Sequence, residues 1–242
     1  MDDCEVLIKN GKKIFICENH NEVLKFWSEF KDLKPYLVSF DHHTDLHQAF
    51  QHKINEIGSN YKPESQKEFL EIQRKLLSEL KENNFGNISE LKNDEHIDAA
   101  IKLEYFEKAM IYSFDSYFHR KDRVWTINFD DKYENQKIIV NSLCIKENNN
   151  LIESKTLEPC FGFFDDYIDK DLWKNNYILD IDLDFFKTKQ SILPEDGIFF
   201  KSLINNAIAI SIAKESRFVN YVKEDDNLTA EYLLEKLLHM IE

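Results

Sequence analysis

Short apolar segments alternate with amphipathic helical segments along this chain, and this alternation restricts the fold more than any other feature. The clearest apolar segment is 177–182, and segments 13–17, 36–40 and 109–114 have the same character. Between them, apolar residues recur at helical spacing, as in 65–82. Strands that alternate with helices form parallel sheets covered on both faces. We therefore predict an α/β fold with three α/β/α layers and a mainly parallel sheet.

The 242 residues contain no internal repeat and no long linker, so we expect a single catalytic domain over 1–242. The region 116–159 is the least regular part and is interpreted as an insertion or a hairpin layer. The other elements that the patterns predict are strands at 124–129, 137–144 and 207–213, and helices at 23–30, 95–106, 199–206 and 228–241.

The composition excludes several common classes of protein. A formal net charge of −14 disfavours nucleic acid or an anionic membrane as a partner. The five glycines lie far apart, so they form no dinucleotide-binding, Walker A or nucleophile-elbow motif. The four cysteines have no C-x-x-C spacing, which argues against a structural zinc site or a disulfide framework. With neither a signal peptide nor a membrane-spanning apolar run visible, we expect a soluble cytoplasmic protein.

Two clusters of acidic residues follow predicted strands. The first is Asp41-His42-His43-Thr44-Asp45, in which residues 41, 43 and 45 would point the same way in an extended chain. The second is Asp180-Ile181-Asp182-Leu183-Asp184, with three carboxylates on one face of an apolar strand. Aspartate is uncommon in strands, and buried carboxylates without compensation are unfavourable. A single Asp of this kind would be a cap or turn residue, but two such clusters indicate a divalent metal site.

The type of ligand indicates which metal. Carboxylates with one or two imidazoles and no thiolate suit Mn²⁺, Fe²⁺ or Co²⁺ better than structural zinc. Four Asp charges would balance two divalent ions, so we predict two Mn²⁺ ions. Such a pair lowers the pKa of a water molecule until hydroxide is available near neutral pH.

The same segments carry a resemblance to a known family. Ser-Phe-Asp-His-His-Thr-Asp-Leu-His (39–47) and Leu-Asp-Ile-Asp-Leu-Asp-Phe-Phe (179–186), together with His20 after the first strand, resemble the ligand motifs of the arginase/deacetylase superfamily. They are most similar to a small branch that includes the peptide arginases of ribosomal-peptide biosynthesis. Those enzymes convert arginine side chains of a precursor peptide to ornithine and release urea. The resemblance extends from about residue 14 to 215 and implies an arginase-like fold.

The resemblance also implies a ligand set. One ion would be bound by His20, Asp41, Asp45 and Asp182. The other would be bound by His43, Asp41, Asp182 and Asp184. Asp41 and Asp182 would then bridge the two ions. The alternative register, in which Asp180 and Asp182 form the ligand pair, stays open. We prefer Asp182 and Asp184 because superfamily members often carry a small polar residue where Asp180 stands.

Other residues are candidates for roles beside the metals. Asp45 is also a candidate catalytic residue, and Glu215 occupies a position comparable to the guanidinium-binding Glu of arginases. His96 and His119 are candidate proton shuttles to the leaving amine. His42 and His47 flank the first motif and are expected to support the ligands or lie on the surface.

The substrate prediction depends on the residues around the two motifs. The segment 46–50 offers few groups that would bind a free amino acid, and Phe185-Phe186 replaces the usual Gly and Pro after the second motif. Phe185, Phe186 and the stretch 114–118 are expected to line a groove for a peptide. We therefore predict a peptide arginase whose partner is an arginine-containing precursor peptide. The alternatives are another ureohydrolase or amidohydrolase, agmatinase-like or deacetylase-like, or a non-catalytic binding protein stabilised by metal.

Overall fold

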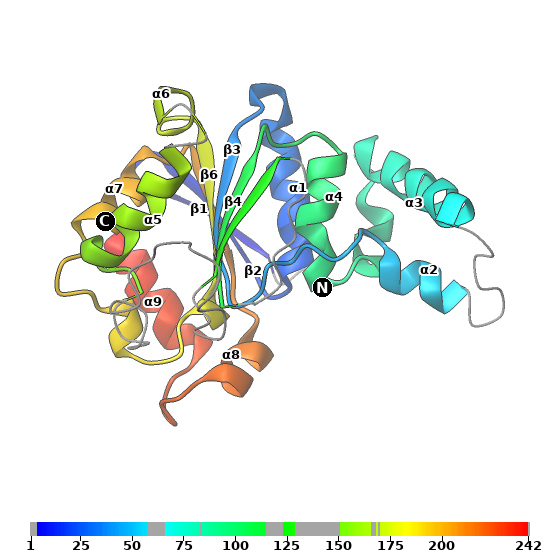
Figure 1. The fold of residues 1–242 in the computed structure, drawn as a ribbon. Helices are drawn as coiled ribbons and strands as arrows, with labels where there is room; N and C mark the ends of the chain where they lie inside the picture. Colours follow the sequence, from blue (N-terminus) through cyan, green and yellow to red (C-terminus); the bar gives the residue numbers. More distant parts are fainter. Residues whose placement is uncertain are drawn as a thin grey trace, which may run out of the picture.

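A seven-stranded sheet forms the centre of the protein (Figure 1). The computed structural model describes residues 4–57, 66–82, 84–114, 123–128, 151–165, 168 and 170–241. The strand order is β1-β2-β7-β6-β3-β4-β5. All neighbouring strands are parallel except β1 and β2. The strands are β1 (Glu5–Lys9), β2 (Lys12–Cys17), β3 (Tyr36–Phe40), β4 (Ala109–Ser113), β5 (Val124–Asn128), β6 (Tyr177–Asp182) and β7 (Ala209–Ala213).

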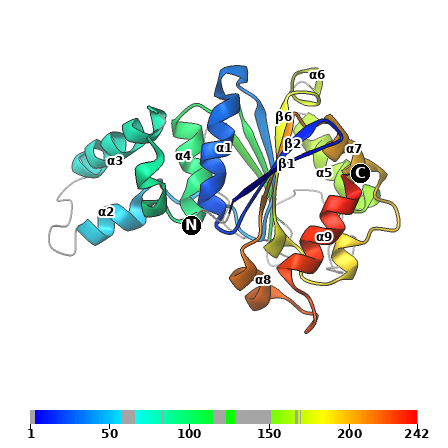
Figure 2. The ribbon, with the colours of Figure 1, turned by 180° about the vertical axis from the view of Figure 1, so that it is seen from behind.

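Helices cover both faces of the sheet, as Figures 1 and 2 show. One layer contains α1 (Val23–Trp27), α2 (Gln51–Ile57), α3 (Gln66–Lys81) and α4 (His96–Lys102). The opposite layer contains α5 (Ser154–Asp165), α7 (Ile198–Asn206) and α9 (Ala230–Met240). Each layer packs on its own apolar cluster, so the predicted α/β/α sandwich is confirmed.

The short helices are α6 (Lys170–Trp173) and α8 (Ser216–Val222), and the 3-10 turns are η1 (His20–Glu22), η2 (Ser28–Leu33), η3 (Phe85–Glu90), η4 (Asn93–Glu95), η5 (Leu183–Phe185) and η6 (Gln190–Ile192).

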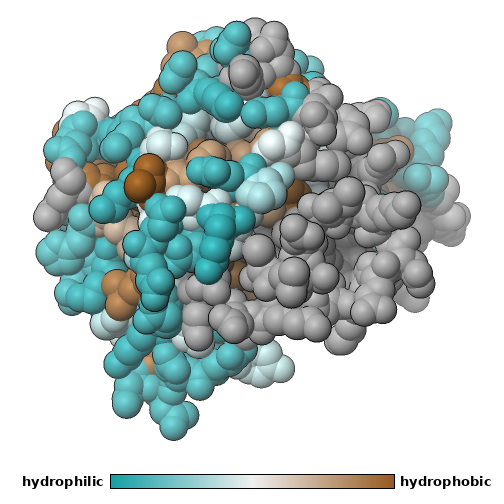
Figure 3. Space-filling model, turned by 60° about the vertical axis from the view of Figure 1, so that its left-hand side comes forward, coloured by the Kyte–Doolittle hydropathy of each residue, from teal (hydrophilic) through white to brown (hydrophobic). Residues whose placement is uncertain are grey.

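The central strands explain why the chain adopts this fold. Every residue of β3, β4, β6 and β7 is buried, as expected for parallel strands that lie between two helical layers. Where residues are coloured, the face of the molecule in Figure 3 is mostly hydrophilic, with apolar areas among the polar ones. Among the described residues, no helix is both long and apolar enough to cross a membrane.

Some elements differ from the sequence prediction. Strand β1 was not predicted, yet it pairs with β2 through a two-residue turn, Asn10-Gly11. Both turn residues have positive φ angles, 49° and 72°, which is the conformation that tight hairpins require. Helices α2 and α8 were also missed, and α5 occupies the end of the predicted irregular region 116–159. The strand predicted at 137–144 lies outside the described residues.

Candidate metal centre

Four neighbouring strands end at one edge of the sheet, the edge that faces α8 at the bottom of Figure 1. His20 follows β2, Asp41 follows β3, Asp182 ends β6 and Glu215 follows β7. The register brings these ends level, because Phe40 pairs with Ile181 and Asp182 pairs with Ala213. Ligands of parallel α/β sheets gather at this edge. The fold therefore brings together polar residues that are far apart in the sequence, such as His20 and Glu215, which are separated by 195 positions.

The fully buried imidazole of His20 lies at the centre of the first donor group. Its Nδ1 is 3.1 Å from Asp45 Oδ2, 3.1 Å from Asp182 Oδ2 and 3.4 Å from Asp41 Oδ2. His20, Asp41 and Asp45 are close enough to hold one ion together, and so are His20, Asp182 and Glu215. The four residues that the family resemblance assigns to one ion therefore lie next to one another in space: His20, Asp41, Asp45 and Asp182.

His43 belongs to a second donor group on the side of the site that is open to solvent. Its Nδ1 is 3.4 Å from Asp184 Oδ2 and 3.8 Å from Asp41 Oδ1, and its side chain is 41% exposed. Asp41 therefore directs one carboxylate oxygen toward His20 and the other toward His43. Asp41 thus has one oxygen near each of the two donor groups.

The local backbone orients the carboxylates. Asp41 Oδ1 accepts a hydrogen bond from the His43 N–H at 2.7 Å, and Asp182 Oδ1 accepts one from the Asp184 N–H at 3.0 Å. Asp184 Oδ1 accepts one from the His42 N–H at 3.1 Å. In each of these residues Oδ2 faces an imidazole of the site, which is His20 for Asp41 and Asp182 and His43 for Asp184. The structure corrects the picture of two extended segments, because the chain bends after Phe40 and Asp184 lies in the turn η5.

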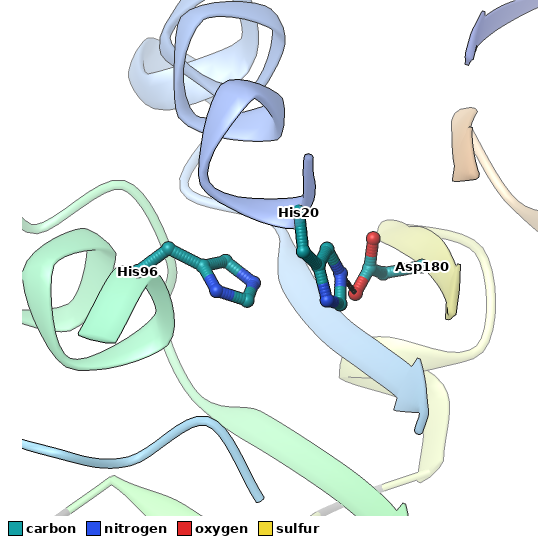
Figure 4. A group of neighbouring side chains, drawn as sticks. All are labelled: His20, His96 and Asp180. Atoms are coloured by element: carbon teal, nitrogen blue, oxygen red, sulfur yellow. Dashed lines mark hydrogen bonds and ion pairs between the residues drawn. The ribbon is translucent and has the colours of Figure 1, made fainter. Parts of the chain in front are cut away.

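Asp180 lies on the other side of His20. It accepts from His20 Nε2 at 3.0 Å (Figure 4). His20 Nδ1 faces the other carboxylates. The Ser211 and Ser39 hydroxyls also donate to Asp180, at 2.6 and 3.0 Å, since both serines pair with it in the sheet. Trp27 Nε1 in turn donates to Ser211 Oγ at 2.9 Å. A carboxylate that holds the second nitrogen of a histidine is a common support for a metal ligand.

His96 is buried behind His20, with the two ring centroids 4.1 Å apart (Figure 4). Its Nδ1 is 2.5 Å from the carbonyl oxygen of Asn93 and 3.5 Å from Asp45 Oδ2. Burial lowers the pKa of His96 to about 3, so the ring is neutral at physiological pH. Its Nδ1 is taken up by the Asn93 carbonyl oxygen. Proton transfer by His96 stays a prediction.

Glu215 closes the site from the end of β7. Its Oε1 accepts from the His20 N–H at 3.3 Å and from the Asn93 side-chain amide. Burial raises the pKa of Glu215 to about 7. Glu215 and Asp45 both have positive φ angles, 37° and 50°, which non-glycine residues adopt rarely and mostly where surrounding structure enforces them.

The electrostatics of the site are compatible with a bound cation. Among the described residues, His20 Nδ1, Asp41 Oδ2 and Asp184 Oδ2 are buried atoms that have no hydrogen-bond partner. Burial opposes a charge on His20, but Asp180, Asp182 and Asp41 outweigh it and raise the pKa of His20 well above its usual value. For Asp182, burial and the charges of Asp184 and Glu215 raise the pKa well above its usual value. Buried His and Asp groups of this kind can hold a metal ion.

The other residues that the sequence analysis singled out lie in different environments. His47 is exposed, and the ring of His42 packs against Phe114, with 5.4 Å between centroids. His119 lies outside the described residues. The prediction that Phe185 and Phe186 line a groove is wrong, because both are fully buried in the apolar core.

Several contributing residues were missed. Ser39, Ser211 and Trp27 support Asp180, and Asn93 contacts Glu215. Phe218 on α8 lies at the open side, with its ring centroid 6.1 Å from that of His43. The serines carry a signal of their own, because each is a polar residue inside an otherwise apolar strand. Comparison of the chain with protein-family models, curated proteins and solved structures gave no match.

Proposed function

We propose that the protein is a binuclear manganese hydrolase that converts arginine side chains of a peptide to ornithine and releases urea. The observation that carries this proposal is the position of Asp41, whose two oxygens face two different imidazoles. His20, Asp45 and Asp182 would complete one site, and His43, Asp182 and Asp184 the other. Ligands rich in carboxylate with one imidazole per ion suit Mn²⁺.

Two divalent ions held there would supply Lewis-acid chemistry, which makes hydroxide available near neutral pH. The chain's own residues would bind and orient the substrate. A guanidinium is always protonated and presents several N–H donors in a plane. Glu215 is suited to accept from it, because this carboxylate is only 7% exposed and Asn93 holds one of its oxygens in place.

The reaction adds water across one C–N bond. A C–O bond forms at the guanidinium carbon, the bond from that carbon to Nε breaks, and Nε leaves as an amine that must gain a proton. We assign the transfer of this proton to Asp45. Its Oδ2 is 3.1 Å from His20 Nδ1 and 3.5 Å from His96 Nδ1. Asp180 would keep Nδ1 of His20 directed into the site throughout.

Two aromatic residues of α8, rather than Phe185 and Phe186, support the preference for a peptide. Phe218 and Tyr221 are 39% and 85% exposed, and Phe218 lies next to His43 at the open side. Aromatic side chains there could contact the residues on either side of an arginine. Binding energy from such remote contacts can position the reacting group.

The test is urea release with Mn²⁺, together with mass spectrometry of the product. We expect kcat/KM for an arginine-containing peptide to be at least about 100-fold higher than for free L-arginine, a difference of about 2.7 kcal/mol. Phe218→Ala and Tyr221→Ala should lower this value for the peptide and leave slow turnover of free arginine unchanged.

Three outcomes would contradict the proposal in different ways. Equal turnover of free arginine or agmatine would reject the peptide substrate. Hydrolysis of acylated amines without urea release would favour a deacetylase-like amidohydrolase. Two bound metal ions with no turnover of any of these compounds would favour a metal-stabilised binding protein.

A further inference from the structure

A second group of metal-ligating side chains lies on the surface, outside the proposed manganese centre. It consists of His47 from the loop after Asp45, His52 from the first turn of α2, and Asp94 from the turn η4. We propose that these three residues form a separate mononuclear site for Zn²⁺ or a similar divalent transition metal. We name it the surface site.

The distances suit such an ion. Asp94 Oδ2 is 2.7 Å from His47 Nδ1 and 3.8 Å from His52 Nε2, and the three donor atoms lie within 4.8 Å of one another. Ligand atoms around a tetrahedral zinc ion are about 3.3 Å apart. Small side-chain rotations would therefore bring all three atoms onto one ion. The imidazoles are about half exposed, which leaves room for water in the fourth position.

Hydrogen bonding explains only part of this arrangement. The bond between His47 and Asp94 satisfies one pair of atoms. His52 Nε2 is too far from Asp94 for a hydrogen bond, and Asp94 Oδ1 is a buried atom without a partner among the described residues. A cation bound between them would account for the approach of His52 Nε2 to Asp94 Oδ2.

The backbone already holds the ligands in place. The His47 N–H donates to the Asp94 carbonyl oxygen at 3.0 Å, and the His52 N–H donates to Glu95 Oε1 at 2.8 Å. Glu95 is fully buried and also accepts from the Lys92 N–H at 3.1 Å. The two segments that carry the ligands are therefore fixed together before an ion binds, which lowers the entropic cost of binding.

The surface site would also be linked to the buried one. The turn η4 carries Asn93, which donates to Glu215, and His96 follows directly. An ion bound at the surface site would hold this turn against the start of α2. It would thereby stabilise the side of the proposed centre that Asn93 and His96 form.

The test uses the full-length protein loaded with Mn²⁺ and then titrated with Zn²⁺. Calorimetry gives the affinity, and elemental analysis after removal of excess metal counts manganese and zinc separately. We expect one zinc ion per chain, bound without loss of manganese. His52→Ala and Asp94→Asn should each weaken zinc binding at least tenfold. His239→Ala removes another exposed histidine, on α9, and should have no effect.

Circular dichroism of each variant shows whether it is folded, and the milder His52→Gln replaces any variant that is not. Zinc that binds equally to wild type and to the His52 and Asp94 variants would overturn the proposal. Zinc that enters only by displacing manganese would also overturn it. Because the readout is metal content, failure of the arginase assay would not affect this result.

Discussion

The proposed manganese centre and the surface site contain the same kinds of side chain in opposite environments. His20, Asp41 and Asp182 are almost completely inaccessible to solvent, whereas His47 and His52 are about half exposed. Water can solvate the charges of the surface site, so that site does not depend on an ion for its stability. In the interior, unpaired carboxylates are strongly disfavoured, and a cation or a set of bound protons must compensate for them.

The two sites also differ in how the chain assembles them. The surface site joins two short segments, 47–52 and 93–95, through local backbone hydrogen bonds. The buried centre joins the ends of four strands, so it exists only when the whole sheet is formed. Metal binding to the buried centre should therefore be linked to global folding, and binding at the surface site only to local order.

The largest expected effect comes from Asp41→Ala or Asp182→Ala. Each residue would contact both ions, so either change should remove manganese and reduce activity to background. Metal analysis and the urea assay measure both losses on the same sample. Glu235→Gln, which changes an exposed carboxylate on α9, is the matched control and should retain both properties. An Asp41 variant with two manganese ions and full activity would refute the bridging role.

The next largest effect distinguishes the roles of Asp180 and Asp184 in metal binding. If Asp184 is a ligand, Asp184→Ala should lose the ion next to His43. Asp180→Asn should keep both ions but weaken manganese binding by about 10- to 100-fold, because it disturbs only the residue that orients His20. Titration of the metal-free variants with Mn²⁺ measures this difference. A greater loss of metal in Asp180→Ala than in Asp184→Ala would favour the alternative register.

The sequence was sufficient to predict the parallel sheet and the strand ends that meet, because buried parallel strands and their polar ends leave a local pattern. Asp41, Asp182 and Glu215 could be placed at one edge for this reason. The role of Asp180 could not be predicted in the same way. It depends on Ser39 and Ser211, which lie far away in the sequence and become its neighbours only through the register of β3, β6 and β7.

Two other differences have local causes. Strand β1 could have been predicted, since Asn10-Gly11 lies between two short apolar segments, 6–8 and 14–16, and Asn-Gly in such a place is a strong hairpin signal. Burial of Phe185 and Phe186 could not have been predicted, because the 3-10 turn after Asp182 redirects the chain into the core. Phe218 reaches His43 through tertiary contact alone, and nothing in its own segment indicates this.

Removal of metal should have a moderate effect on stability. An ion at 100 times its dissociation constant stabilises the folded state by about 2.7 kcal/mol, which corresponds to about 5–10 °C in Tm for a chain of this size. Chelation by EDTA should lower Tm by this amount, and Mn²⁺ should restore it. Thermal melts followed by circular dichroism provide the measurement. An unchanged melt would mean that the buried carboxylates are compensated without metal.

The smallest expected effect is that of His47→Ala. The side chain is exposed, so its loss should change the free energy of unfolding by about 0.5 kcal/mol or less and leave the manganese content intact. A parallel chelation melt of this variant should show the same shift as wild type. Loss of manganese would show that the surface site and the buried centre are not separate.

The most direct test of the buried centre is electron paramagnetic resonance of the manganese-loaded protein, with metal content measured on the same sample. The shared position of Asp41 predicts two manganese ions per chain and the spectrum of a spin-coupled pair. The same sample of Asp41→Ala should lose that spectrum. A single uncoupled manganese signal, or no bound manganese at all, would contradict the binuclear centre.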